Sequence, residues 1–264
     1  MRRTLGPGIE VILAPNPGLM TWPGTNQYVL GGGEVVVDAA ALDEENARRL
    51  HGAAPRPARL VLTHIHPDHV GGAGTLRERT GARVAVHASR AAFPGLAPDD
   101  LIDDGDEIAW GDGRLRAVHT PGHESGHVCW YDPERRWLLT GDTILSTGTT
   151  VIAPPDGDMG AYLASLERLR ALDLVRLLPG HGDPIERPYE VIDEYLSHRR
   201  LREAQIADGV AAGIDTIPVL VERIYVGLHQ GLVWAAQRTV RAHLDKLVAE
   251  GVVVEEADER FRRG

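Results

Sequence analysis

A dense run of potential metal ligands follows directly on an apolar segment of this 264-residue chain. Leu60–Leu62 reads as the end of a buried strand, and the motif Thr63–His69, T-H-I-H-P-D-H, comes immediately after it. Residues two apart in an extended segment face the same way, so His64 and His66 can approach one metal together. The aspartate and the histidine beyond the proline can point to a second position nearby. Imidazole and carboxylate are ligands that zinc accepts, and the motif therefore predicts a metal site at a strand end.

Three more motifs of the same kind end other predicted strands. They are His119–His123 (H-T-P-G-H), Thr140–Asp142 (T-G-D) and Pro179–Gly182 (P-G-H-G). Each places a potential ligand beside a glycine, the residue that a tight turn and a close backbone approach require. This is the layout of a metal site assembled from loops along one edge of a sheet.

Composition narrows the class of protein. The chain is 43% hydrophobic and 25% charged, which is ordinary for a soluble globular protein, and no segment has the roughly 18 consecutive apolar residues of a membrane span. The N-terminus lacks the apolar core of a secretory signal, so we expect a cytoplasmic protein without a membrane partner. The single cysteine, Cys129, excludes a disulfide framework and a thiolate-rich zinc knuckle. The net charge of −10 disfavours generic binding to polyanions.

Short β-branched runs and helical patterns share the first two thirds of the chain. Their mixture predicts an α/β sandwich with helices outside paired sheets. The expected helices are Glu44–His51, Ala73–Thr80 and Met159–Ala171. The expected strands are Ile9–Leu13, Gln27–Leu30, Glu34–Asp38, Arg59–Thr63, Arg83–Val86, Leu115–His119, His127–Tyr131, Trp137–Thr140 and Leu174–Leu178.

The pattern changes after Pro188. Tyr189–Ala212 predicts one long helix, and Asp215–Pro218 reads as a helix start. Leu232–Glu250 is an amphipathic helix that Gly251 would end, ahead of a β-rich segment. We therefore expect a catalytic domain over residues 1–186, followed over residues 187–264 by the long helix and a small winged-helix-like module.

Taken together, H-x-H-x-D-H, T-P-G-H, G-D and P-G-H-G occur in the order found in the metallo-beta-lactamase superfamily, which this chain resembles. The resemblance implies a four-layer αβ/βα sandwich and two Zn²⁺ ions, although Mn²⁺ or Fe²⁺ would suit the same donors. It implies His64, His66 and His123 on the first metal, Asp68, His69 and His181 on the second, and Asp142 bridging both.

The resemblance also bears on the substrate. True beta-lactamases of the superfamily usually lack the bridging aspartate, so Asp142 favours another hydrolase. The stretch Thr120–His127 is similar to glyoxalase II, a thioesterase. The chain as a whole resembles the beta-lactamase-like protein 2 group, which includes a mitochondrial endonuclease for single-stranded RNA. The features that carry this likeness are Gly24–Tyr28, Gly148–Thr150, Tyr195–Arg199 and the C-terminal helical module.

The expected mechanism needs no covalent intermediate. Two zinc ions about 3.5–4 Å apart would lower the pKa of a bridging water towards about 7 and hold hydroxide as the nucleophile. Asp68 would accept the proton of the nucleophile, which makes it a catalytic residue as well as a ligand. Ser125 and Cys129 are then unnecessary as nucleophiles.

Other side chains have two interpretations each. Asp38, Thr63 and Thr120 stand at strand ends, where they would orient ligand histidines or serve as ordinary caps. His127 and His198 would contact substrate, or His127 would be an ordinary buried strand histidine. His198 would line the pocket together with Arg199, Arg200 and Arg202, but a solvated helix face is the favoured interpretation of these arginines.

Three functions follow from these observations. The first is hydrolysis of a small-molecule ester, thioester or lactone, and the second is cleavage of single-stranded RNA, which wants a positive groove with stacking aromatics. The third is DNA binding through Leu232–Glu250, but residues 187–264 carry 11 basic against 13 acidic side chains. We therefore favour a C-terminal module that caps the active site or forms a homodimer contact. Only 38 residues separate Asp142 from His181, which leaves no room for the inserted domain of RNA-processing members.

Overall fold

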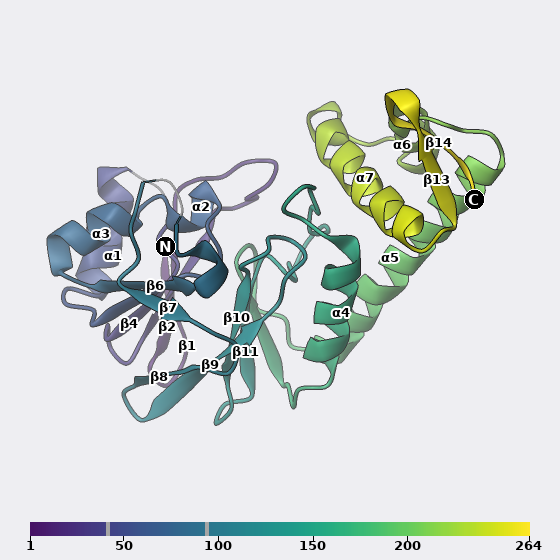
Figure 1. Cartoon of the computed structure of the whole chain (residues 1–264). Helices are drawn as coiled ribbons and strands as arrows, with labels where there is room; N and C mark the ends of the chain where they lie inside the picture. Colours follow the sequence, from purple (N-terminus) through teal and green to yellow (C-terminus); the bar gives the residue numbers. More distant parts are fainter. Residues whose placement is uncertain (41–42, 93–94) are drawn as a thin grey trace. The chain divides into compact units, whose positions relative to one another are not determined.

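The computed structural model describes residues 1–40, 43–92 and 95–264 in two compact units (Figure 1). The first unit comprises residues 1–120, 126–148 and 172–188, and the second comprises residues 121–125, 149–171 and 189–264. Among the described residues, no helix combines the length and the apolar character that crossing a membrane requires.

A seven-stranded sheet forms one layer of the first unit. Its strands lie in chain order, antiparallel from β1 to β4 and parallel from β4 to β7. The strands are β1 (Arg2–Gly6), β2 (Ile9–Leu13), β3 (Asn26–Leu30), β4 (Val35–Val37), β5 (Arg59–Val61), β6 (Arg83–His87) and β7 (Asp100–Ile102).

A five-stranded sheet forms a second layer, in the order β12-β11-β10-β9-β8. Neighbours are antiparallel except β11 and β12, which run parallel, so both of those strands end at the same edge. The strands are β8 (Glu107–Trp110), β9 (Gly113–His119), β10 (Val128–Asp132), β11 (Trp137–Gly141) and β12 (Arg176–Pro179).

Alternating side chains of the first sheet serve two cores. In β4, Val35 and Val37 join the cluster between the two sheets, which also holds Trp110 and Trp130. Val36 belongs to a separate cluster with residues of the helices α1 (Glu44–Ala53) and α3 (Ala73–Thr80), which lie side by side in Figure 1. A strand buried on both faces reads as a continuous apolar run, and this explains the sequence V-V-V. The expected paired sheets with helices outside are confirmed in this unit.

The second unit is mainly helical. Residues of α5 (Pro188–Ala211), α6 (Ile217–Ile224), α7 (Val233–Ala249) and the hairpin β13 (Val253–Glu256) and β14 (Arg260–Arg263) share one core. Thr216 is the residue before α6, and its proline lies in the first turn, as the helix-start signal predicts. Two helices followed by a two-stranded hairpin make the expected winged-helix-like module (Figure 1). The helix α4 (Met159–Arg170) also belongs to this unit.

Four strands lack a counterpart among the sequence expectations. They are β1, β7, β8 and β14, and each has at least one exposed or half-exposed residue. Edge strands bury few side chains, so they carry a weak apolar signal, whereas the central strands are found within a few residues of their expected bounds.

The packing predicts that substituting two leucines of the same sheet by alanine has very different effects on stability. Leu60 is 0% exposed beneath the helices, and Leu101 is 51% exposed. We expect Leu60→Ala to lower the free energy of unfolding by about 2–5 kcal/mol, because it leaves a cavity. Leu101→Ala should change it by less than about 0.5 kcal/mol. Urea denaturation measures both, and equal losses would contradict this assignment of the core.

Candidate metal centre

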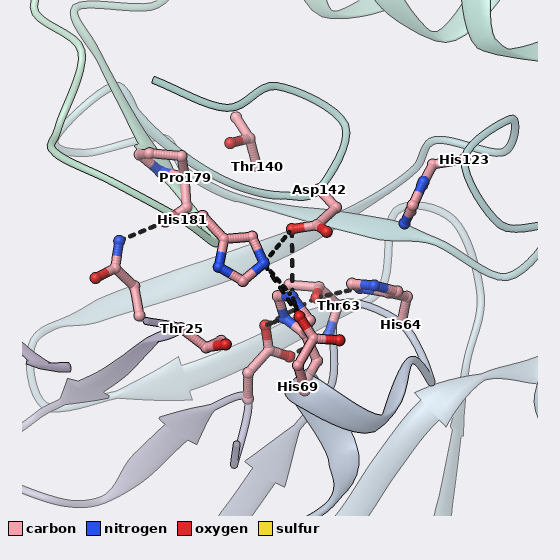
Figure 2. Close-up of polar contacts among 12 residues, drawn as sticks. Thr25, Thr63, His64, His69, His123, Thr140, Asp142, Pro179 and His181 are labelled. Carbon is pink, nitrogen blue, oxygen red and sulfur yellow. Dashed lines mark hydrogen bonds and ion pairs between the residues drawn. The ribbon is translucent and has the colours of Figure 1, made fainter. Parts of the chain in front are cut away.

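Four of the predicted ligands converge in the first unit. Asp68 and His69 lie on the short helix α2 (Pro67–Val70), Asp142 follows β11, and His181 follows β12. One donor atom from each of these side chains lies within 4.8 Å of the others. Figure 2 shows Asp142, His181 and His69 turned towards one another. The parallel pairing of β11 and β12 brings two of these ligands to one edge.

The spacing of the donors suits a small cation. Nε2 of His69 lies 3.3 Å from Nε2 of His181. Oδ1 of Asp142 lies 3.2 Å from the first nitrogen and 3.4 Å from the second. Oδ2 of Asp68 lies 3.6 Å and 3.2 Å from the same two atoms. A tetrahedron with metal–ligand distances of about 2.0–2.1 Å has edges of about 3.3 Å, so the four donors fit a divalent metal.

Hydrogen bonds fix which nitrogen of each ring faces the cluster. Nδ1 of His69 donates to Oδ2 of Asp38 at 2.8 Å, and Nδ1 of His181 donates to the carbonyl of Gly24 at 3.1 Å. These partners can only accept, so in a neutral ring the lone pair lies on Nε2. Two nitrogen lone pairs then face two carboxylates, an arrangement that a cation stabilises.

The pKa values show the same need for positive charge. Burial lowers the pKa of His181, but the carboxylates of Asp142 and Asp68 outweigh it and raise the pKa to about 9. Burial also lowers the pKa of His69, but Asp142 and Asp38 outweigh this effect and raise the pKa well above its ordinary value. Burial raises the pKa of Asp142, but the two imidazoles hold it well below its usual range. Protons therefore compete with a metal for the two Nε2 atoms.

Asp38 holds the ligand histidines from behind. It is buried in a left-handed conformation with φ of 60°. Besides His69, it accepts bonds from the backbone N–H of Thr63 at 2.7 Å and from the Thr63 hydroxyl at 2.8 Å. Because that hydroxyl donates to Asp38, Nδ1 of His64 donates to it in turn, at 3.0 Å. The expected orienting role of Asp38 and Thr63 is consistent with these bonds, which direct both rings.

The three remaining expected ligands are placed as follows. His64 and His66 lie in the first unit, with ring centroids 4.7 Å apart. His123 lies in the second unit, where its Nδ1 donates to the carbonyl of Val151 at 2.7 Å. That bond puts the lone pair of a neutral His123 ring on Nε2, the same nitrogen that His69 and His181 turn towards their cluster.

His127, expected either to contact substrate or to be an ordinary buried strand histidine, lies inside the first unit. Its side chain is fully buried, and Nε2 accepts from the backbone N–H of Asp142 at 3.1 Å. Nδ1 lies 2.9 Å from the hydroxyl of Thr120 and 3.1 Å from that of Thr143. With both ring nitrogens occupied inside the protein, His127 suits a positioning residue for Asp142, in line with its other interpretation as a buried strand histidine.

Asn26 and Tyr28, for which the sequence patterns predicted no individual role, hold the turn that carries His181. The Asn26 side chain donates to the carbonyls of Pro179 and Gly182 at 2.9 and 2.8 Å. The Tyr28 hydroxyl donates to the carbonyl of Pro179 at 2.7 Å. Both residues belong to the motif Gly24–Tyr28, which carries the family likeness without revealing what its side chains contact.

Gly180 is needed for close approach. A Cβ atom at this position would lie 2.7 Å from Oδ1 of Asp142 and 2.7 Å from Cε1 of His69. Any larger residue would push two ligands apart, so the glycine beside His181 is a requirement of the cluster.

The arginines of α5 differ from one another. Arg200 is exposed and pairs with Glu167 at 2.6 Å, as a solvated helix face predicts. Arg199 is instead buried, and the favoured expectation of a solvated face is wrong for it. Its guanidinium donates to the hydroxyl of Thr149 at 2.6 Å and to the carbonyl of Thr150 at 2.5 Å. Within the second unit it thereby ties the motif Tyr195–Arg199 to Thr149 and Thr150, the last two residues of the motif Gly148–Thr150.

His198 is half-buried beside these arginines. Its Nε2 accepts from Nε of Arg202 at 3.3 Å. Burial, with the charges of Arg199 and Arg202, lowers the pKa of His198 to about 4, so the ring is neutral at pH 7. Its expected contact with substrate remains a prediction.

The cations of α7 are largely paired within the second unit. Arg241 bonds to Asp245 and to Glu255, both at 2.7 Å. Lys246 bonds to Glu203 and Glu250, both at 2.8 Å. Neutralised side chains are poor contacts for nucleic-acid phosphates, which disfavours DNA binding by this helix.

Known proteins share this architecture. Residues 20–181 match the metallo-beta-lactamase superfamily domain, and residues 216–262 match the beta-lactamase associated winged helix domain. A Caenorhabditis elegans protein named beta-lactamase-like protein 2 homolog is 31% identical over 272 residues, covering 98% of this chain and 90% of that one. An Aspergillus fumigatus protein named atrochrysone carboxyl ACP thioesterase is 30% identical over 208 residues, covering 76% and 64%.

Two solved structures extend the comparison. A metallo-beta-lactamase family protein from Thermus thermophilus superimposes with a TM-score of 0.83 at 24% identity, over 99% of this chain and 100% of that one. A second protein, solved in a di-iron-bound form, gives a TM-score of 0.56 at 30% identity, over 68% of this chain and 96% of that one.

The pKa of His181 predicts opposite pH dependences with and without metal. In the metal-free protein its pKa is about 9, against an ordinary 6.5, so its charged form favours the folded state. That stabilisation is complete below about pH 6.5 and is lost as the pH rises through 9. We expect the urea concentration at the unfolding midpoint of chelator-treated protein to decrease as the pH is raised from about 6.5 to about 9.5. An increase over the same range would contradict this prediction. In His181→Gln this decrease of the midpoint should be smaller. When metal is added instead, the stabilisation that metal binding gives should be weaker at low pH, because protons compete for the ligand nitrogens.

Asp38 predicts a loss of metal affinity without the loss of a ligand. In Asp38→Asn an amide N–H would face the donors of Thr63 or His69, so the rings lose their fixed direction. We expect zinc affinity to fall by about 10–100-fold, measured by competition with a fluorescent chelator. Asp132→Asn is the matched control, since Asp132 is equally buried but bonds to Arg135. Equal affinity in both variants would remove Asp38 from this role.

Proposed function

Since this chain belongs to the metallo-beta-lactamase superfamily, we propose that it is a dinuclear zinc hydrolase of an ester, thioester or lactone. Family membership and the donor cluster make it a metal-dependent hydrolase. The observation that carries the finer proposal is the convergence of Asp142 with Asp68, His69 and His181 at spacings of 3.2–3.6 Å.

We assign the seven ligands to two metals as the resemblance of their motifs to the superfamily implies. Asp142 is the residue proposed to contact both. The five-residue segment 121–125 that carries His123 is flanked by Thr120 and Gly126, which both belong to the first unit. The first metal takes His64, His66 and His123, and the second takes Asp68, His69 and His181.

The metal pair, when bound, supplies the Lewis acidity that turns water into a nucleophile near neutral pH. Zinc is our choice for this set of imidazole and carboxylate donors, with iron or manganese as alternatives. The similar structure that was solved in a di-iron-bound form supports iron as one of these alternatives.

Asp68 is the proposed proton acceptor. Its side chain is 28% exposed, whereas that of Asp142 is 14% exposed, so Asp68 has the better access to solvent and substrate. Burial raises the pKa of Asp68, but His181 and His69 lower it by more than burial raises it. The net shift of the pKa is therefore downward, and the carboxylate is ionised at neutral pH. An ionised carboxylate held beside the reacting centre can take up the proton of an attacking water.

Several observations support an acyl substrate. The relative named as a thioesterase acts, by its name, on a carrier-protein thioester. The glyoxalase II-like stretch Thr120–His127 favours the same bond class. An RNA substrate has less support, because the chain has a net charge of −10 and the main cations of α7 are paired.

A substrate panel tests the proposal. Zinc-loaded protein is assayed with an acyl thioester, a lactone, a cephalosporin, a phosphodiester and single-stranded RNA. We expect the thioester or the lactone to be cleaved, and Asp142→Ala to lower the rate by more than about 100-fold, beyond the loss typical of an outer-shell partner. Asp183→Ala, which alters an exposed aspartate near the His181 turn, should leave the rate unchanged.

Two results would contradict the proposal. A rate that survives Asp142→Ala would overturn the dinuclear mechanism. Cleavage of RNA alone, lost on Asp68→Ala, would replace the acyl substrate with a phosphodiester. Reconstitution with iron or manganese in place of zinc, followed by the same assay, decides which metal supports turnover.

A further inference from the structure

The loop that carries His123 is held at two points within the second unit. At the first, Nδ1 of His123 donates to the carbonyl of Val151 at 2.7 Å. At the second, Gly122 lies directly against Tyr162 of α4, where a Cβ atom on the glycine would stand 2.3 Å from Cα of the tyrosine. The direction of the His123 ring therefore depends on two neighbours, the segment around Val151 and the fully buried Tyr162.

Arg199 contacts both of these neighbours. Its Nη2 donates to the hydroxyl of Thr149 at 2.6 Å and to the carbonyl of Thr150 at 2.5 Å. These two residues directly precede Val151. The guanidinium carbon also lies 5.2 Å from the centre of the Tyr162 ring, in a cation–π contact. One side chain of α5 thus joins the two segments that hold the histidine.

The guanidinium of Arg199 is buried without a counter-ion. The residue is 1% exposed. Among the residues that the structure describes, no carboxylate forms an ion pair with it, and its Nε has no hydrogen-bond partner. A buried charge that lacks an opposite charge costs folding free energy, and an apolar side chain of similar size often fills such a place at lower cost. Stability alone therefore does not account for an arginine at this position.

We propose that Arg199 is a positioning residue for His123 and thereby for the first metal of the proposed pair. This inference rests on the proposed function, because it takes the assignment of ligands made there as its premise. The planar guanidinium fixes the segment before Val151, and the carbonyl of Val151 fixes the ring, so that Nε2 of His123 keeps one direction. The ligands assigned to the second metal lie in the first unit, and their affinity for metal should not depend on Arg199.

Zinc titration of the full chain tests this, because the two proposed metals serve as references for each other. Competition with fluorescent chelators measures the affinity for each, and His123→Ala identifies the first metal as the one whose affinity falls. We expect Arg199→Met to lower the affinity for the first metal by about 10–100-fold, as the loss of an outer partner of a ligand does. The affinity for the second metal should stay unchanged. Arg199→Lys keeps the charge but lacks the planar fork, so it should retain part of the affinity.

Two further variants separate positioning from a general loss of stability. Leu244→Ala is the matched control, since Leu244 is fully buried in the same unit but belongs to the core around α7. It should lower the thermal melting temperature, because it leaves a cavity, and keep both zinc affinities. Thr149→Val removes one acceptor of Arg199 at an exposed position, so it should fold. We expect it to weaken the first metal alone, by a smaller factor than Arg199→Met.

A double substitution shows whether the effect passes through the histidine. In His123→Ala, the added Arg199→Met should cause no further loss of zinc affinity, because the ring that the arginine positions is already gone. A loss that adds fully to that of His123→Ala would overturn the inference.

Other results would also overturn it. They are unchanged affinity for the first metal in both Arg199→Met and Thr149→Val, an equal loss at both metals, and zinc binding that His123→Ala leaves unaltered. In the first two cases a wild type that binds two zinc ions would leave the proposed function standing. A wild type that binds a single zinc ion, weakened by both His123→Ala and Arg199→Met, would support the positioning role and count against the dinuclear centre.

Discussion

The fit of four electron-rich atoms into one small space governs this structure. Two imidazole nitrogens and two carboxylate oxygens at 3.2–3.6 Å repel one another unless protons or a metal cation lie among them. The surrounding chain maintains that arrangement, since Asp38 and the Gly24 carbonyl take the outer nitrogens of the rings and Gly180 allows the close approach. A rigid scaffold that holds like groups together is what a tight metal site requires.

Local sequence patterns predicted the parts of this site that depend on strand ends. The H-x-H-x-D-H motif follows a buried strand, and G-D and P-G-H-G follow two more, so their side chains were expected at one edge. The donors of Asp68, His69, Asp142 and His181 do meet there. Likewise, the central strands were found because burial on one or both faces leaves a strong apolar signal.

Contacts between distant segments were not predictable from those patterns. Asn26 reaches Pro179 across 153 positions of the chain, and Arg199 reaches Thr149 across 50. A charged residue on a helix is ordinarily solvated, and only the folded chain shows that Arg199 is buried with specific partners. The apolar pattern did not predict the edge strands, because these strands bury few side chains. Fold and metal chemistry follow from the motifs, whereas the substrate depends on the loops around them.

Anomalous diffraction at the zinc edge, from crystals of the zinc-loaded chain, tests the central claim most directly. We expect two peaks per chain, both within coordination distance of Asp142, one of them bound by Asp68, His69 and His181. A single peak away from Asp142, or none at these side chains, would contradict the dinuclear centre on which the proposed hydrolase rests.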